Sequence, residues 1–304
     1  MVELVADKVT EIQFDPNAGM NTTDEVLLAQ VNHSIRLGLP QAQPWQINPA
    51  TALLVCGGAS LAQTERELVD AYWKGGKIVT VNGAYQWCID RNLKPSAAIM
   101  LDAREFNSRF LETPVEGCRY LLASQCHPKT FEVCAGRDVT LWHACSAGDK
   151  EVDLLCEFYF QKRDENGQFT NRRTVYPVTL GTTVGIRAVS LLRMMGFASQ
   201  DIWGLDSCWI DGNHHAYSQP ENNRDGRRPV WLRPPGRDDK ALRFECAPWH
   251  MKQAQDFQQL IRERGDLFRL NVRGPGLIAS MMRTGAEIQT ENRTNEHHDE
   301  ARQG

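Results

Sequence analysis

The chain has 304 residues, of which 41% are hydrophobic, and a formal net charge of −4 at pH 7. This length and apolar content suffice for a large buried core, whereas the weakly acidic balance argues against a broad nucleic-acid-binding surface. No apolar run approaches the roughly 20 residues of a membrane helix, and the first residues lack the apolar centre of a signal peptide. We therefore expect a cytoplasmic protein without a membrane span.

The nine cysteines form no Cys-x-x-Cys pair, so their spacing indicates neither a zinc site nor a thioredoxin-like motif. Most lie inside apolar runs, as do Cys56, Cys88 and Cys156. We interpret them as buried, reduced thiols.

Residues 1–50 are predicted to be an N-terminal extension with one helix at 23–37, which starts at a Thr/Asp cap and carries helical apolar spacing. Short apolar runs then alternate with helix-like segments. Strands are predicted at 51–58, 77–82, 97–102, 119–124, 139–144, 201–206 and 267–272. Continuous apolar runs of this length are typical of strands buried on both faces of a parallel sheet.

The predicted fold class is therefore α/β, a Rossmann-like doubly wound, mostly parallel sheet with helices on both faces and an inserted loop region. This domain is expected to span 51–285, with a Pro-, Arg- and Trp-rich insertion at 208–248. Residues 146–178, which include a polar and charged stretch, interrupt the alternation of apolar runs and helix-like segments and are predicted to form a surface hairpin or flap. The polar tail, 286–304, is expected to be disordered.

Two predicted turns carry glycine or hydroxyl residues where a strand or loop meets a helix. Gly57-Gly58-Ala59-Ser60 follows the first strand, and Gly181-Thr182-Thr183 precedes a long helix. Free N–H groups at helix starts suit a phosphate, so both are candidate phosphate sites. An ordinary tight turn and an ordinary Thr cap explain them equally well. Neither is a Walker loop, because no Gly-Lys-Ser/Thr follows.

Three polar residues end other predicted strands, at the edge where open α/β sheets bind ligands. Asn82 ends the second strand, where a dinucleotide-binding protein would carry an acid, and is a candidate for bonding a base, a sugar or a loop. Asp102 and Asp206 are candidate Mg²⁺ ligands that would hold the ion against phosphate oxygens. The alternative is that each caps a helix or pairs with a neighbour such as Arg104.

The insertion carries the candidate catalytic residues His214 and His215, each suited to act as a general acid or base. Nearby arginines are suited to clamp phosphate or carboxylate: Arg224, Arg227, Arg228 and Arg233. We predict that this segment is a lid over a nucleotide site; a solvated loop or an oligomer contact is the alternative. His127 and His143 also lie near strand ends; the alternative to a site role is that each is a hydrogen-bonded core histidine.

Three stretches in order, VCGGASL, KIVTVNGAYQWCIDRNLKPSAAIMLDAR and GTTVGIRAVSLLRMMGFASQDIWGLDS, carry a family resemblance. Over about residues 51–275 the chain resembles the MptE-like 6-hydroxymethylpterin diphosphokinase family. The resemblance implies a Rossmann-like fold and, as in archaeal members, Mg²⁺-dependent transfer of diphosphate from ATP to a hydroxymethyl-dihydropterin. It implies binding-site roles for Gly57, Gly58, Ser60, Asn82, Asp102, Gly181, Thr182 and Asp206.

The same strand-end pattern is similar to bacterial sialyltransferases and motility-associated glycosyltransferases, which use CMP-activated nonulosonic acids and usually a catalytic histidine. Three hypotheses follow: a Mg²⁺- and ATP-dependent diphosphokinase-like transferase, a glycosyltransferase using a CMP-sugar or other nucleotide-sugar, and a nucleotide-binding module without catalysis. The expected partners are a small-molecule nucleotide and, for either transferase, an unidentified acceptor, and an oligomer is compatible with all three hypotheses.

Overall fold

The computed structural model describes residues 22–145, 176–222, 226–233 and 241–285. The tail predicted at 286–304 and nearly all of the hairpin or flap predicted at 146–178 lie outside the described residues.

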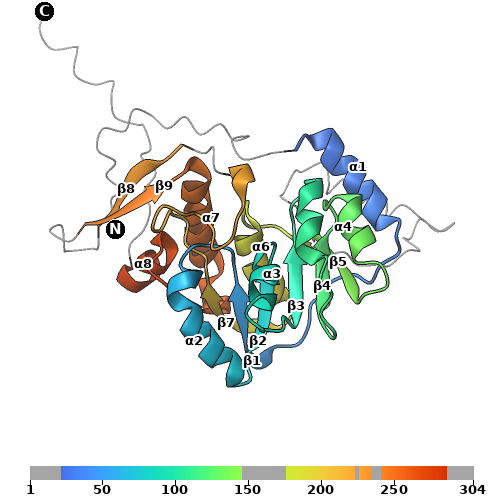
Figure 1. The fold of residues 1–304 in the computed structure, drawn as a ribbon, viewed down its shortest axis with the longest axis horizontal. Helices are drawn as coiled ribbons and strands as arrows, with labels where there is room; N and C mark the ends of the chain where they lie inside the picture. Colours follow the sequence, from blue (N-terminus) through green and yellow to red (C-terminus); the bar gives the residue numbers. More distant parts are fainter. Residues whose placement is uncertain (1–21, 146–175, 223–225, 234–240, 286–304) are drawn as a thin grey trace, which may run out of the picture.

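An eight-stranded, entirely parallel sheet forms the centre of the protein, in the order β10-β7-β1-β2-β3-β4-β5-β6 (Figure 1). Its strands are β1 (Asn48–Val55), β2 (Lys77–Val81), β3 (Ala97–Met100), β4 (Arg119–Ala123), β5 (Val139–Ala144), β6 (Pro177–Val178), β7 (Phe197–Trp203) and β10 (Arg269–Val272). Every strand predicted from an apolar run is confirmed within this one sheet. The short β6 extends the sheet beyond the predicted strands by pairing with the end of β5.

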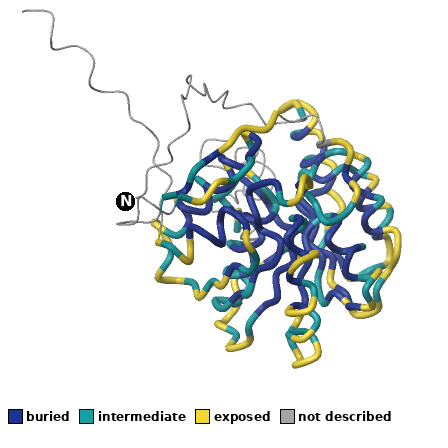
Figure 2. The backbone as a smooth tube through the Cα atoms, turned by 60° about the vertical axis from the view of Figure 1, so that its left-hand side comes forward, coloured by how far each residue is buried: buried dark blue, intermediate teal, exposed yellow. Residues whose placement is uncertain are grey.

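Helices cover both faces of the sheet, which confirms the predicted fold class. Along β1, Leu53 and Val55 pack with α2 and α3, whereas Ala52 and Leu54 belong to the larger core on the opposite face. Successive side chains of a strand point to opposite faces, so burial of both sets explains the continuous apolar run. Buried residues, drawn dark blue, fill the middle of the molecule in Figure 2. The helices are α1 (Asp24–Ile35), α2 (Leu61–Trp73), α3 (Ala84–Ile89), α4 (Pro128–Val133), α6 (Val184–Met194), α7 (Pro248–Arg264) and α8 (Leu277–Thr284), with 3-10 segments η1 (Glu105–Leu111), η2 (Pro220–Asn222) and η4 (Gly265–Leu267).

The helix predicted at 23–37 is present as α1 and lies beside α4 at the β5 end of the sheet (Figure 1). Val31 and Ile35 are buried in the main core. The hydroxyl of Ser34 donates to the carbonyl of Ser124 over 2.8 Å. α1 is therefore held to the sheet by both apolar packing and a buried hydrogen bond.

Part of the insertion forms an antiparallel hairpin, β8 (Arg228–Leu232) with β9 (Leu242–Cys246), where the sequence predicted only a loop. Val230 pairs with Phe244, and Leu232 with Leu242. Val230 and Leu232 are buried. Alternating apolar residues were the available signal, and the surrounding Pro and Arg residues obscured it.

The eight cysteines among the described residues are all buried and free, as predicted for those positions. None of the helices described in the structure combines the length and apolar character needed to cross a bilayer.

Gly204, directly after β7, tests how tightly the strand ends are packed. It has φ +67°, and an ideal Cβ at this position would lie 2.7 Å from the carbonyl oxygen of Cys56. Gly38 has nearly the same φ, +66°, with no atom within 4 Å of its ideal Cβ. We expect Gly38→Ala to cost roughly 1 kcal/mol for the left-handed backbone alone. Gly204→Ala should cost roughly 1–3 kcal/mol more because of the steric clash. Urea unfolding of both variants measures the difference, and equal losses would show that the turn after β7 can relax.

Candidate functional site

The order of the strands reverses between β1 and β7. From β1 the chain builds the sheet outward to β6 and then returns to the other side of β1 as β7. Doubly wound sheets bind ligands outside the carboxyl ends of the strands at such a switch point. The turn after β1, residues 57–60, and the segment after β7, residues 204–207, therefore mark the candidate site.

Asp206 joins these two segments directly. Its carboxylate accepts hydrogen bonds from the backbone N–H of Ser60 over 2.8 Å and from the Ser60 hydroxyl over 2.5 Å. Burial raises the pKa of Asp206 to about 6, although the two bonds from Ser60 act in the opposite direction. Gly58 and Gly276 permit this close approach, because an ideal Cβ on either would collide with Asp206. The carboxylate thus occupies the start of α2, and phosphate binding by Gly57, Gly58 and Ser60 stays a prediction.

The insertion lies over the ends of β1 and β2. The backbone N–H of Ala216 donates to the carbonyl of Gly57 over 3.0 Å. The side chain of Tyr217 fills the space beside Gly57 and Gly83, where a Cβ on either glycine would collide with it. Burial raises the pKa of the Tyr217 hydroxyl, so this group is neutral. The segment therefore packs against the ends of these strands, and its role as a lid over a nucleotide stays a prediction.

A cavity of about 430 Å³ opens within this segment. It is lined by Trp209, Gly212, Asn213, His214, His215, Tyr217, Ser218, Gln219 and Arg227. The ring of His214 lies 4.5 Å from the ring centroids of both Trp209 and His215. The guanidinium of Arg227 sits 3.5 Å from the centroid of the Trp209 ring, a cation–π contact. The structure therefore brings together both predicted catalytic histidines and one of the predicted arginines.

The imidazoles of His215 and His250 are neutral at pH 7. Burial, reinforced by the neighbouring His214, lowers the pKa of His215 to about 3. Burial lowers the pKa of His250 equally, to about 3, and its Nδ1 accepts the N–H of Ala247 over 3.0 Å. Nδ1 of His215 has no hydrogen-bond partner among the described residues. A neutral imidazole has one nitrogen that can accept a proton, which is the property a general base requires.

Asn82, at the end of β2, has a left-handed backbone with φ 44°. This conformation is uncommon for residues other than glycine and most accessible to Asn and Asp. Its buried Oδ1 has no hydrogen-bond partner among the described residues, and an unpaired buried acceptor is costly. Asn82 thus stays a candidate ligand contact, because its Oδ1 can accept a hydrogen bond from a ligand.

The predicted second phosphate site, at the start of α6, faces α7 instead of open space. Thr182 donates its N–H and its hydroxyl to one carboxylate oxygen of Asp256, over 2.8 and 2.6 Å. Gln253 donates to the Thr183 hydroxyl over 2.7 Å and accepts from the Ser207 hydroxyl over 2.6 Å. Phosphate binding by Gly181, Thr182 and Thr183 stays a prediction. The network ties α6 and α7 to the segment that follows β7.

The two predicted metal ligands are not brought together. Asp102 forms an ion pair with Arg104, with 2.6 Å between the nearest nitrogen and oxygen, and also accepts the Arg104 backbone N–H. β3 and β7 are separated by β1 and β2, which places their ends about 14 Å apart at about 4.8 Å per strand. Mg²⁺ requires its oxygens at about 2.1 Å, so this arrangement does not fit one ion held by both Asp102 and Asp206. Within the described ranges, no three His, Cys, Asp or Glu side chains form a group that could hold a metal.

His127 and His143 both form hydrogen bonds within the protein. Nδ1 of His127 accepts the N–H of Lys129 at the start of α4. His143 is buried and bonds Gln41 over 2.7 Å, and burial lowers its pKa to about 4.

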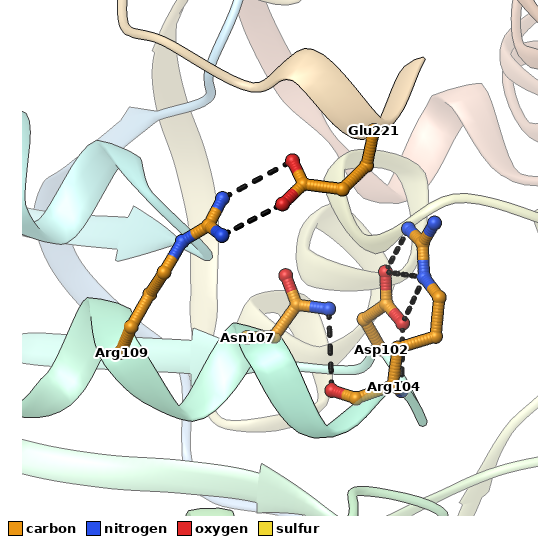
Figure 3. Close-up of polar contacts among 5 residues, drawn as sticks. All are labelled: Asp102, Arg104, Asn107, Arg109 and Glu221. Carbon is orange, nitrogen blue, oxygen red and sulfur yellow. Dashed lines mark hydrogen bonds and ion pairs between the residues drawn. The ribbon is translucent and has the colours of Figure 1, made fainter.

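A second polar cluster, which the sequence analysis missed, lies beyond the carboxyl end of β3 (Figure 3). Arg109 of η1 forms a two-bond ion pair with Glu221 of η2, over 2.7 and 3.2 Å. The two side chains are 38% and 25% exposed, and such a pair contributes about 0–1 kcal/mol to stability. Asn107 lies between this pair and the Asp102–Arg104 pair in Figure 3. Arg109 and Glu221 are 112 positions apart, so no sequence spacing predicts their contact.

Comparison with known proteins supports the fold class. No protein-family model and no curated protein sequence matches the chain. Among solved structures, it is similar to the MAf glycosyltransferase from Magnetospirillum magneticum AMB-1, with a TM-score of 0.53 and 12% identity. The alignment covers 83% of this chain but only 36% of that protein. The chain therefore shares its fold with part of a glycosyltransferase, whereas the MptE-like resemblance rests on the sequence motifs alone.

The Ser60–Asp206 contact predicts a specific pH dependence. Asp206 has a folded-state pKa raised from 3.8 to about 6, so the folded protein binds this proton more tightly than the unfolded chain does. Its contribution to stability is present at low pH and is lost as pH rises from about 4 to about 6, by roughly 3 kcal/mol for a two-unit shift.

Asp206→Asn removes this titration, so the stability of the variant relative to the native protein should rise over that pH range and then level off. Buried histidines titrate in the opposite direction, but they are common to both proteins and cancel in the difference. Tm measured for both proteins from pH 4.5 to 7.5 provides the comparison. A difference that stays constant with pH would mean that Asp206 is ionised throughout.

Proposed function

We propose that the chain is a glycosyltransferase that takes a nucleotide-activated sugar at the carboxyl edge of β1, β2 and β7. The observation that carries the proposal is the cavity over this edge, lined by His214, His215, Tyr217 and Arg227. A fold shared with part of a glycosyltransferase supports it. One fold hosts many reactions, so the side chains that line the cavity decide the chemistry.

The cavity supplies the groups that sugar transfer needs. As the acceptor hydroxyl attacks the anomeric carbon, a carbon–oxygen bond forms there and the bond from that carbon to the nucleotide phosphate breaks. A neutral imidazole takes the proton of the acceptor hydroxyl. The leaving phosphate gains negative charge, which the guanidinium of Arg227 would stabilise.

His215 is the better placed of the two histidines. It lies against the turn after β1, where an ideal Cβ on Gly57 would be 2.9 Å from its ring. His214 is buried between Trp209 and His215, which suits a residue that orients its neighbour. We therefore assign the acid/base role to His215 and a positioning role to His214.

Diphosphate transfer from ATP is the alternative. That chemistry depends on neutralising phosphate charge, for which Asp102 and Asp206 were the candidate metal ligands. Each carboxylate is instead bonded within the protein, to Arg104 and to Ser60. A histidine-lined cavity fits sugar transfer better, and the same ligand screen tests both reactions.

Ligand-dependent stability separates the two functions. We expect a panel of CMP-, UDP- and GDP-sugars to include at least one that raises Tm, and ATP with Mg²⁺ to raise it less. A ligand at 100 times its Kd should stabilise the protein by about 2.7 kcal/mol. Free CMP, UDP and GDP separate recognition of the nucleotide from recognition of the sugar. Stabilisation by ATP with Mg²⁺ alone would favour the diphosphokinase.

Single substitutions test the two histidine roles. With a donor from the screen, His215→Ala should lower kcat by 10²- to 10⁴-fold, the usual contribution of a general acid or base, with donor Kd within about threefold. His214→Ala should lower kcat less and Tm more, because its ring is buried. Donor hydrolysis, donor Kd and Tm are measured for each variant. The assignment is wrong if His215→Ala retains full turnover.

A further inference from the structure

The carboxylate of Glu221 occupies a position in which the anionic group of a ligand could bind. It lies on η2, four residues after Tyr217, and its two oxygens face the guanidinium of Arg109 in parallel. Planar guanidinium groups bind carboxylates and phosphates in this same two-bond geometry. The contact joins the insertion to η1, which follows β3 at the ligand-binding edge of the sheet.

The cationic side of this contact is held in place whether or not Glu221 is present. The guanidinium of Arg109 lies 5.0 Å from the ring centroids of both Phe106 and Phe110. The guanidinium of Arg104 also packs on Phe106, 4.7 Å from the ring centroid. Its charge helps to lower the pKa of Glu221, after the larger effect of Arg109. Two cations therefore act on one carboxylate.

Asn107 provides an independent sign of a ligand. Its side chain is fully buried, at 0% exposure, and its Oδ1 has no hydrogen-bond partner among the described residues. The amide lies between the Arg109–Glu221 pair and Asp102 with Arg104 (Figure 3). An unpaired buried amide acceptor is unfavourable, and a hydroxyl from a ligand would satisfy it.

The site is also adjacent to the cavity. The rings of Phe110 and Tyr217 are in edge contact, with centroids 5.9 Å apart, and Tyr217 lines the cavity. Ser218 and Gln219, between Tyr217 and η2, line it as well. A ligand in the cavity therefore lies one side chain away from Arg109.

We propose that Arg109, with Arg104 and Asn107, forms an anion-binding site in which Glu221 stands in for the phosphate or carboxylate of a hydroxyl-bearing ligand. Binding of that ligand displaces Glu221 and releases η2 from η1. The exposed, two-bond contact suits displacement, because solvent already screens much of its attraction. The inference deepens the proposed function by naming the charged group of its substrate, and it rests on that function only for the ligand's identity.

Direct titration tests the site without any transfer reaction. The probes are inorganic pyrophosphate for the phosphate source, glucuronate for the carboxylate source, and glucose as the neutral control, in calorimetric titrations at low salt. Glu221→Gln should lower the Kd of at least one anion by fivefold or more, because the internal competitor is neutralised. Arg109→Gln should raise that Kd at least tenfold. Neither variant should change the response to glucose.

Two controls separate the site from general charge effects. Glu112→Gln removes one exposed negative charge at the end of η1 and keeps the backbone N–H that Glu112 donates to the Arg109 carbonyl, so it should change the anion Kd by less than twofold. Asp138→Asn breaks the exposed Arg119–Asp138 pair at the opposite end of the strands and should also have no effect. Equal tightening by Glu112→Gln and Glu221→Gln would overturn the proposal.

Two further readouts identify the ligand and the movement. Stronger binding of pyrophosphate assigns the site to a phosphoryl group. If glucuronate binds more strongly than pyrophosphate, and Asn107→Ala weakens glucuronate binding, the site is assigned to a hydroxy acid. Hydrogen exchange at residues 218–222 should speed up when the anion binds and be fast from the start in Glu221→Gln. Unchanged exchange, or an unchanged Kd in Glu221→Gln, overturns the proposal. Anion binding without sugar transfer would overturn the proposed function alone.

Discussion

The contact between Asp206 and Ser60 fixes the site on which the rest of the functional argument depends. It links the turn after β1 to the segment after β7, the two strands between which the winding of the sheet reverses. The carboxylate is buried and keeps a raised pKa, so the link has an electrostatic cost that its two hydrogen bonds offset in part. Glycines at 58 and 276 are needed because any larger residue would push the carboxylate away.

Around this link, the insertion is held by contacts of different strengths. Tyr217 is enclosed by Gly57 and Gly83, and Ala216 is tied to the backbone of the first turn. Glu221, farther along, is held by a part-exposed ion pair to Arg109. A segment that is firmly attached at 216–217 and weakly attached at 221 can open at one end while its histidines keep their place. Ligand-binding loops require such low local stability in the part that moves.

The fold and the chemistry support the functional conclusion to different degrees. The shared fold with part of a glycosyltransferase places the chain among Rossmann-like sheets, which host many reactions. The neutral imidazole of His215 near the switch point favours sugar transfer over phosphoryl transfer, because it suits proton transfer more than metal-assisted chemistry. Asp102 and Asp206 show that a residue's position at a strand end does not determine which other strand-end residues lie near it. Both end strands at the ligand edge, yet two intervening strands keep them apart.

The sequence by itself determined the sheet, because strands buried on both faces must be apolar without interruption, and each such run became a parallel strand. It also determined that the candidate residues lie at one edge, since parallel strands all end there. Tertiary structure alone decided which of these residues meet. Strand order separated Asp102 from Asp206, and the return of the chain beside β1 joined Asp206 to Ser60. The pairing of Arg109 with Glu221 and the cluster of His215 with Tyr217 over Gly57 likewise depend on how the insertion packs, because contacts between distant segments leave no periodic trace in the chain.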